Sequence, residues 1–135
     1  MRAVLDVNVL VSALIAPAGT PARLLLDWQD GRFELIVSPL LLAELERALS
    51  YPKLQRLVPA ADAGAFVAWL GRSATVANDP DDPPPLRSAD PGDDYLIVLA
   101  SHQDAVLVSG DRHLLELAAA LPILAPAAFL KLLTD

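Results

Sequence analysis

The chain has 135 residues, 54% of them hydrophobic, a formal net charge of −7 and no cysteine. This length fits a single domain over residues 1–135, and the lack of cysteine excludes disulfides, thiolate metal sites and cysteine nucleophiles. An acidic chain does not bind nucleic acid through its net charge, so such a ligand would require another source of positive charge, such as a bound cation.

The N-terminal apolar run is interrupted by Asp6 and Asn8, which is not the pattern of a signal peptide. No run of about 18 apolar residues predicts a membrane span. We therefore expect a cytoplasmic protein without a membrane partner.

Strands and helices alternate along the chain, with proline, glycine or a capping residue at most boundaries. The predicted strands are a short one around Val4 and Leu5 ending at Asp6 or Val7, then 34–37, 74–76, 105–109 and 122–124. The predicted helices are 8–16, 22–30 capped by Thr20, 39–50 capped by Ser38, 53–58, 62–71, 90–103, 112–120 and 126–133. This alternation predicts an α/β fold with a central, mostly parallel sheet of about five strands, covered on both faces.

One long segment interrupts the alternation. Residues 78–92 read NDPDDPPPLRSADPG, with five prolines and four acids. This composition predicts a loop whose acids between Asp79 and Asp90 face solvent, and long loops in compact domains are often functional.

Two acids follow predicted strands directly. Asp6 ends the first strand and Asp111 follows the fourth, in VLVSGD. Ligands of open α/β sheets bind at the carboxyl ends of the strands, so these carboxylates are expected to converge there. Each could instead simply cap the helix that follows it.

Two helices supply further acids. Asp93 and Asp94 lie in the first turn of the helix opened by Asp90-Pro91, where acids also favour the helix dipole. Glu44 and Glu46 lie in LLLAELERAL, where apolar neighbours surround both. A buried carboxylate needs a partner such as a metal, or a salt bridge with Arg47 in the case of Glu44. Periodicity does not choose within either pair.

Acids without histidine or cysteine ligands favour a hard cation such as Mg²⁺ or Mn²⁺. Such an ion activates water and binds phosphate oxygens, so phosphodiester hydrolysis is the natural reaction. It would also supply positive potential on an acidic protein. His102 and His113 fit a surface helix position and a helix start.

Four segments in this order resemble PIN domains, most closely the bacterial PIN-family toxins related to VapC. They are LDVNVLVSAL, LLAELERAL, DPGDDYLIVLA and VLVSGDRHLL, and together they cover nearly the whole chain. The resemblance implies an α/β/α sandwich and a Mg²⁺- or Mn²⁺-dependent ribonuclease that acts on RNA. It also implies a homodimer and a protein antitoxin partner.

The resemblance also assigns residues. It implies Asp6, Glu44, Asp93 and Asp111 as the catalytic, metal-binding acids. Within the Asp93–Asp94 pair it selects Asp93, because in the family this acid stands seven residues before the alanine that matches Ala100. Glu46 and Asp94 are the alternates. The family's supporting polar positions match Asn8, Ser12 and Ser109. Arg112, next to Asp111, is a candidate phosphate contact, although an arginine there is more often simply exposed.

Other functions compete with this interpretation. Asp6 at a strand end could be the nucleophile of an aspartate-based phosphotransferase, but such enzymes use Asp-x-Asp and a downstream lysine. Here Asn8 takes the second position, and Lys53 and Lys131 are the only lysines. A non-enzymatic binding module, in which the acids only cap helices, is the other alternative. A PIN nuclease acting on DNA is a further one.

Overall fold

The computed structural model describes residues 1–134. Within them five strands form one parallel sheet in the order β3-β2-β1-β4-β5. The strands are β1 (Arg2–Leu5), β2 (Glu34–Val37), β3 (Thr75–Val76), β4 (Val106–Val108) and β5 (Ile123–Leu124). Central β1 pairs with β2 on one side and with β4 on the other. The predicted five-stranded parallel sheet is confirmed.

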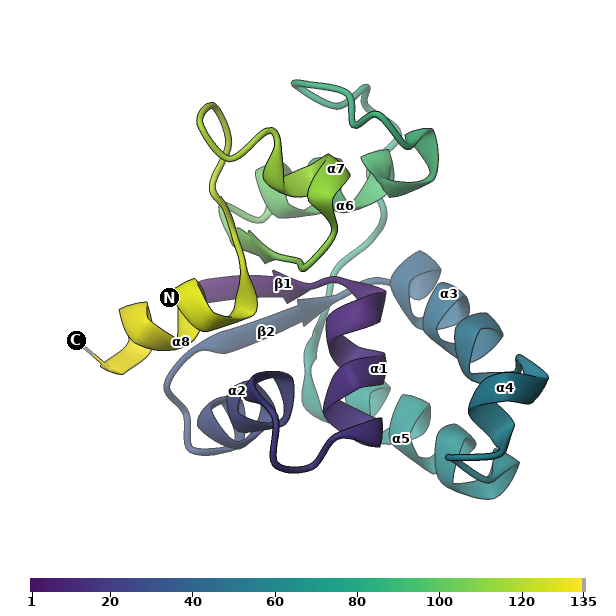
Figure 1. Ribbon diagram of the computed structural model, residues 1–135. Helices are drawn as coiled ribbons and strands as arrows, with labels where there is room; N and C mark the ends of the chain where they lie inside the picture. Colours follow the sequence, from purple (N-terminus) through teal and green to yellow (C-terminus); the bar gives the residue numbers. More distant parts are fainter. Residues whose placement is uncertain (135) are drawn as a thin grey trace.

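Helices cover both faces of this sheet. Figure 1 shows α6 and α7 on one side and α1, α2 and α5 on the other. The helices are α1 (Val7–Ile15), α2 (Thr20–Gln29), α3 (Pro39–Leu49), α4 (Pro52–Gln55), α5 (Ala60–Ser73), α6 (Asp94–His102), α7 (Arg112–Leu115) and α8 (Pro126–Thr134), with a 3₁₀ turn, η1, over Pro91–Asp93. The central strands β1, β2 and β4 are buried over most of their length, which explains why they are mainly apolar instead of alternating.

Most predicted boundaries hold within a few residues, and the exceptions have local causes. The second helix begins at Thr20, so Thr20 is not its cap: Gly19 holds that position. The helix predicted over 90–103 begins as η1, where the Asp90 carboxylate accepts a hydrogen bond from the Gly92 N–H at 3.0 Å. The helix predicted over 112–120 ends at Leu115 and continues as turns.

In residues 1–134 no single helix has the length and apolarity needed to cross a membrane. Taken together α1 and α2 would pass by length and composition, but they are bent by 97° at the break between them.

The start of α3 is held by two side chains. Ser38, which is fully buried, accepts a hydrogen bond from the Leu41 N–H at 3.1 Å, as its predicted capping role requires. Asp79, from the loop after β3, accepts one from the Leu40 N–H at 2.9 Å. The expectation that the loop acids simply face solvent is therefore wrong for Asp79, because an N-terminal N–H of α3 needs an acceptor. Both contacts position α3, which carries Glu44.

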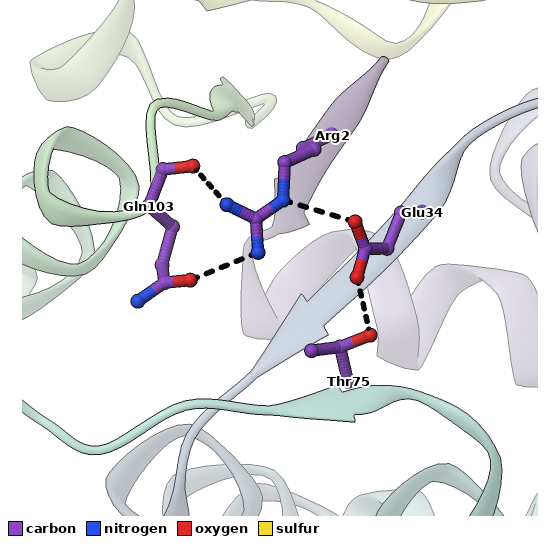
Figure 2. Close-up of polar contacts among 4 residues, drawn as sticks. All are labelled: Arg2, Glu34, Thr75 and Gln103. Carbon is purple, nitrogen blue, oxygen red and sulfur yellow. Dashed lines mark hydrogen bonds and ion pairs between the residues drawn. The ribbon is translucent and has the colours of Figure 1, made fainter.

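A polar cluster ties the sheet together at the amino end of β1 (Figure 2). The Arg2 guanidinium donates to the Glu34 carboxylate at 3.0 Å and to the Gln103 carbonyl oxygen at 2.6 Å. The Thr75 hydroxyl donates to the other Glu34 oxygen at 2.7 Å. Three strands and the turn after α6 are thus joined away from the carboxyl ends of the strands, which leaves those ends open for a site.

We expect Ser38→Ala to lower the free energy of unfolding by about 1 kcal/mol, because the Leu41 N–H loses its acceptor. Urea denaturation followed by circular dichroism measures this loss. The matched control is Ser101→Ala, at an exposed position near the end of α6, which should leave the urea midpoint unchanged. Equal midpoints for Ser38→Ala and the parent would show that the cap does not stabilise α3.

Candidate active site

A cavity of about 190 Å³, here called the acid cavity, lies at the carboxyl end of β1. It is lined from the β1–α1 junction, from the end of α3 through to α4, and from the start of α6. The lining residues are Asp6, Val7, Asn8, Glu44, Arg47, Ala48, Tyr51, Gly92, Asp93 and Tyr95. A larger cavity, of about 280 Å³, lies beside α6, β4 and β5, but its lining is mostly apolar. The acid cavity is the better candidate for chemistry because carboxylates from three segments face it.

Asp6 is the most buried acid of this cavity, with 4% of its surface exposed. Leu5 pairs with Val108, so the residues that follow these strands, Asp6 and Ser109, are neighbours. The Ser109 hydroxyl donates to Asp6 Oδ2 at 2.7 Å. Burial raises the pKa of Asp6 above its usual value, while the Ser109 hydrogen bond opposes that rise. Ser109 therefore orients Asp6 and favours its charged form.

Ser109 also connects Asp6 to Asp111. The same hydroxyl oxygen accepts a hydrogen bond from the Asp111 N–H at 2.9 Å. Asp111 caps α7, its Oδ1 accepting from the His113 N–H at 2.8 Å. Capping thus explains one oxygen of Asp111. Arg112 is exposed at the start of α7 and does not line the acid cavity.

Asp93 is electrostatically coupled to the other acids. Its Oδ2 is buried, and within residues 1–134 no N–H or O–H group donates to it. Burial raises the pKa of Asp93 to about 7, helped by a hydrogen bond with the Asp111 carboxylate and by the negative charges of Asp6, Asp111 and Asp90. Near neutral pH the Asp93 carboxyl is therefore protonated in a substantial fraction of molecules.

Glu44 faces the acid cavity from α3, and Glu46 does not. The Glu44 side chain is 35% exposed and pairs with Arg47, with 2.7 Å between Oε2 and Nη2. Glu46 is exposed and borders a different hollow, beside Leu49 and Ser50. The structure therefore separates two glutamates that periodicity left equivalent, and Arg47 is the partner of Glu44 within the described residues.

Asp94 has a separate role. It is 9% exposed and accepts a hydrogen bond from the Ser88 N–H at 2.8 Å, with Arg87 at 3.3 Å. Asp94 thus anchors the long loop to α6 and does not line the acid cavity, whereas Asp93 does. The two neighbours differ because the helix turns by about 100° between them.

The structure brings Asn8 to the cavity wall but leaves Ser12 out of it. Ser12 lies further along α1 and is not among the lining residues of the described chain. Sequence reasoning named Arg47 only as a salt-bridge partner of Glu44, and it missed the lining residues Tyr51 and Tyr95. Burial and the charges of Asp6, Glu44, Asp93 and Asp79 raise the pKa of Tyr95, which places its hydroxyl in the field of the acids. An aromatic residue at a helix start predicts burial in the core, so nothing in the sequence indicated that Tyr95 lines a cavity.

The donor set suits a hard cation, although the acids are not closed around one. Within residues 1–134 no three His, Cys, Asp or Glu side chains form a group that could hold a metal ion as they are arranged. The candidate ligands are nevertheless all oxygen atoms, as Mg²⁺ and Mn²⁺ prefer. The partnerless Asp93 Oδ2 and the proton that Asp93 retains near neutral pH both mark a deficit of positive charge. The oxygen chemistry of this donor set therefore fits such an ion.

The raised pKa of Asp93 predicts a pH-dependent stability. In metal-free buffer the contribution of Asp93 to the free energy of unfolding is complete below pH 4, where Asp93 is protonated in the folded and the unfolded state. This contribution is lost as pH rises through about 7. Asp93→Asn, which sacrifices no side-chain cap, should therefore raise the melting temperature relative to the parent at pH 8 but not at pH 4.

Differential scanning fluorimetry across this range measures the difference between the two proteins. Asp62→Asn, at an exposed site in the first turn of α5, is the control and should follow the parent at every pH. A constant offset between Asp93→Asn and the parent would contradict the assigned pKa.

Comparisons with known proteins agree with this fold. The chain resembles the crystal structure of PAE2754 from Pyrobaculum aerophilum, at 25% identity and a TM-score of 0.64, with 99% of this chain and 90% of that chain covered. It shares its fold with VapBC2 from Rickettsia felis, solved bound to a DNA fragment from their promoter, at 15% identity, a TM-score of 0.58 and 92% and 97% coverage. No curated protein matches the chain. A sequence model of the PIN domain matches residues 2–113, so the chain belongs to the PIN domain family.

Proposed function

We propose that this protein is a Mg²⁺- or Mn²⁺-dependent endoribonuclease that hydrolyses RNA phosphodiester bonds. The observation that carries the proposal is that Asp6, Glu44 and Asp93 face one cavity at the carboxyl end of β1, with Asp111 joined to Asp6 through the Ser109 hydroxyl. Membership of a family of nucleases that generally use divalent metals supports it. The proposal also accounts for an acidic protein acting on a polyanion, because a bound cation reverses the local charge.

Asp6, Asp93, Asp111 and Glu44 would hold the ion, directly or through water. When bound, it would supply positive charge for phosphate oxygens and make a bound water more acidic. Ser109 orients Asp6 and favours its charged form through its 2.7 Å hydrogen bond. With a pKa near 7 in the metal-free protein, Asp93 is a carboxylate that exchanges its proton close to neutral pH. Glu44 would have to exchange Arg47 for the new partner, since Arg47 now occupies Oε2.

Substitution of Glu44 and Glu46 provides a matched test, because the two acids share one helix and differ in the face they occupy. Glu44→Gln should lower metal-dependent cleavage of a fluorescent RNA substrate by about 100-fold, as Asp6→Asn should. Glu46→Gln should cleave like the parent. Isothermal titration with Mn²⁺ should show weaker binding for Asp6→Asn than for the parent. Glu46→Gln should bind Mn²⁺ like the parent. A parent protein that neither binds Mn²⁺ nor cleaves RNA would refute the proposed nuclease.

The competing functions receive less support from the geometry. Neither lysine lines the acid cavity, so the aspartate-based phosphotransferase lacks the lysine it requires near Asp6. Capping explains Asp111 Oδ1, but it explains neither the buried Oδ2 of Asp93 nor the burial of Asp6, so a purely structural role for the acids is incomplete. A DNA substrate would use the same acids, and parallel cleavage assays with RNA and DNA of one sequence separate the two.

We further propose that the nuclease is the cytoplasmic toxin of a toxin–antitoxin pair, with a protein antitoxin as its partner and a homodimer as its assembly. The structural likeness to the VapBC2 complex is the support for this role. Expression in a bacterial host should arrest growth, because RNA cleavage stops protein synthesis.

Asp6→Ala or Asp111→Ala should restore growth at equal protein levels, and Glu46→Gln should not. Growth curves with immunoblots measure both effects. Equal growth arrest by the parent and by well-folded acid variants would contradict a catalytic toxin.

A further inference from the structure

One wall of the acid cavity is formed by residues other than the acids. It consists of Arg47, Ala48 and Tyr51, at the end of α3 and just before α4. The Arg47 side chain is 67% exposed and Tyr51 is 53% exposed, although both border the cavity. A cation and an aromatic ring, both open to solvent beside an acid site, are the groups that bind a phosphate and an unpaired base.

Arg47 has hydrogen-bonding capacity to spare. A guanidinium carries five N–H donors, and within the described residues one Arg47 nitrogen, Nη2, donates to Glu44. Among the described residues that line the cavity, Arg47 alone is positively charged. Its planar donors suit a phosphate group, which could take the place that the Glu44 carboxylate now holds.

The backbone holds Tyr51 in place. Pro52 follows it and restricts it to extended conformations, as its φ of −63° and ψ of 138° show. Its carbonyl oxygen accepts from the Leu54 and Gln55 N–H groups at 2.9 and 3.0 Å, and so caps α4. The ring is thus presented from a rigid junction, which lowers the entropy cost of stacking on a ligand.

We propose that Arg47 and Tyr51 form a subsite for single-stranded RNA, in which the Tyr51 ring stacks on one base and Arg47 binds the adjacent phosphate. This inference rests on the proposed function, because it places the substrate of that reaction at its site. A base reaches the ring only when it is unstacked, so the subsite selects single strands over duplexes. The contact comes from α3 and from the junction before α4, while Arg112 lies outside the cavity lining.

Fluorescence anisotropy with a labelled 12-nucleotide RNA in Mg²⁺ buffer tests the subsite. Every protein carries Asp6→Asn, so that binding is measured without cleavage. Tyr51→Ala should weaken binding about tenfold, whereas Tyr51→Phe keeps the ring and should bind like its parent. Arg47→Ala should weaken binding by a similar factor and reduce the dependence of the binding constant on salt by about one phosphate contact. Arg72→Ala, in the last turn of α5 and outside the cavity, is the matched control and should bind like its parent.

The same RNA annealed into a duplex should bind at least about tenfold more weakly than the single strand. Equal binding by Tyr51→Ala and its parent, equal binding of duplex and single strand, or no binding of the single strand at all would overturn the subsite. Cleavage by the parent without Asp6→Asn is measured separately. If the parent cleaves RNA but Tyr51→Ala binds RNA as well as its own parent, the subsite is rejected and the nuclease is not. If Tyr51→Ala binds RNA more weakly but the parent does not cleave RNA, the nuclease is rejected and the binding subsite is not.

Discussion

The burial of carboxylates beside one another is the constraint on which the candidate site depends. Burial raises the pKa of Asp6 and of Asp93 at a single edge of the sheet, and the negative charge of Asp111 adds to both shifts. Gathering like charges in a partly buried place costs free energy unless positive charge is supplied. In the metal-free chain a proton on Asp93 and the guanidinium of Arg47 supply part of it. Under the proposed function a bound cation would supply the remainder, which would link the stability of the site to its function.

The fold sustains this arrangement by fixing each acid from a different element. The pairing of β1 with β4 sets Asp6 beside Ser109, and the Ser109 hydroxyl then connects Asp6 to the backbone of Asp111. Ser38 and Asp79 hold the start of α3, which carries Glu44 into the cavity. The Arg2 cluster joins the strands at the opposite end of β1, so these stabilising contacts and the acids do not compete for space.

Much of this could be predicted from the sequence because it follows from local pattern and topology. The apolar strands alternate with helices, which determines a parallel sheet, and acids placed directly after strands must meet at its carboxyl edge. Asp6 and Asp111 were identified on that ground. The choice of Glu44 and Asp93 within their pairs came only from the resemblance to PIN domains. Ser12 was also taken from that resemblance, and the structure leaves it outside the cavity.

The sequence by itself determined the fold class, the edge of the sheet at which chemistry would occur and the oxygen character of the candidate ligands. The tertiary structure alone decided that Asp94 anchors the loop at Ser88, that Asp79 caps α3, and that Arg47 and Tyr51 border the acid cavity. The physical reason is that periodicity predicts which residues share a face of one element, but not which residues of different elements come into contact. The contact of Asp79 with Leu40 joins residues 39 positions apart, and it depends on how the loop packs against α3.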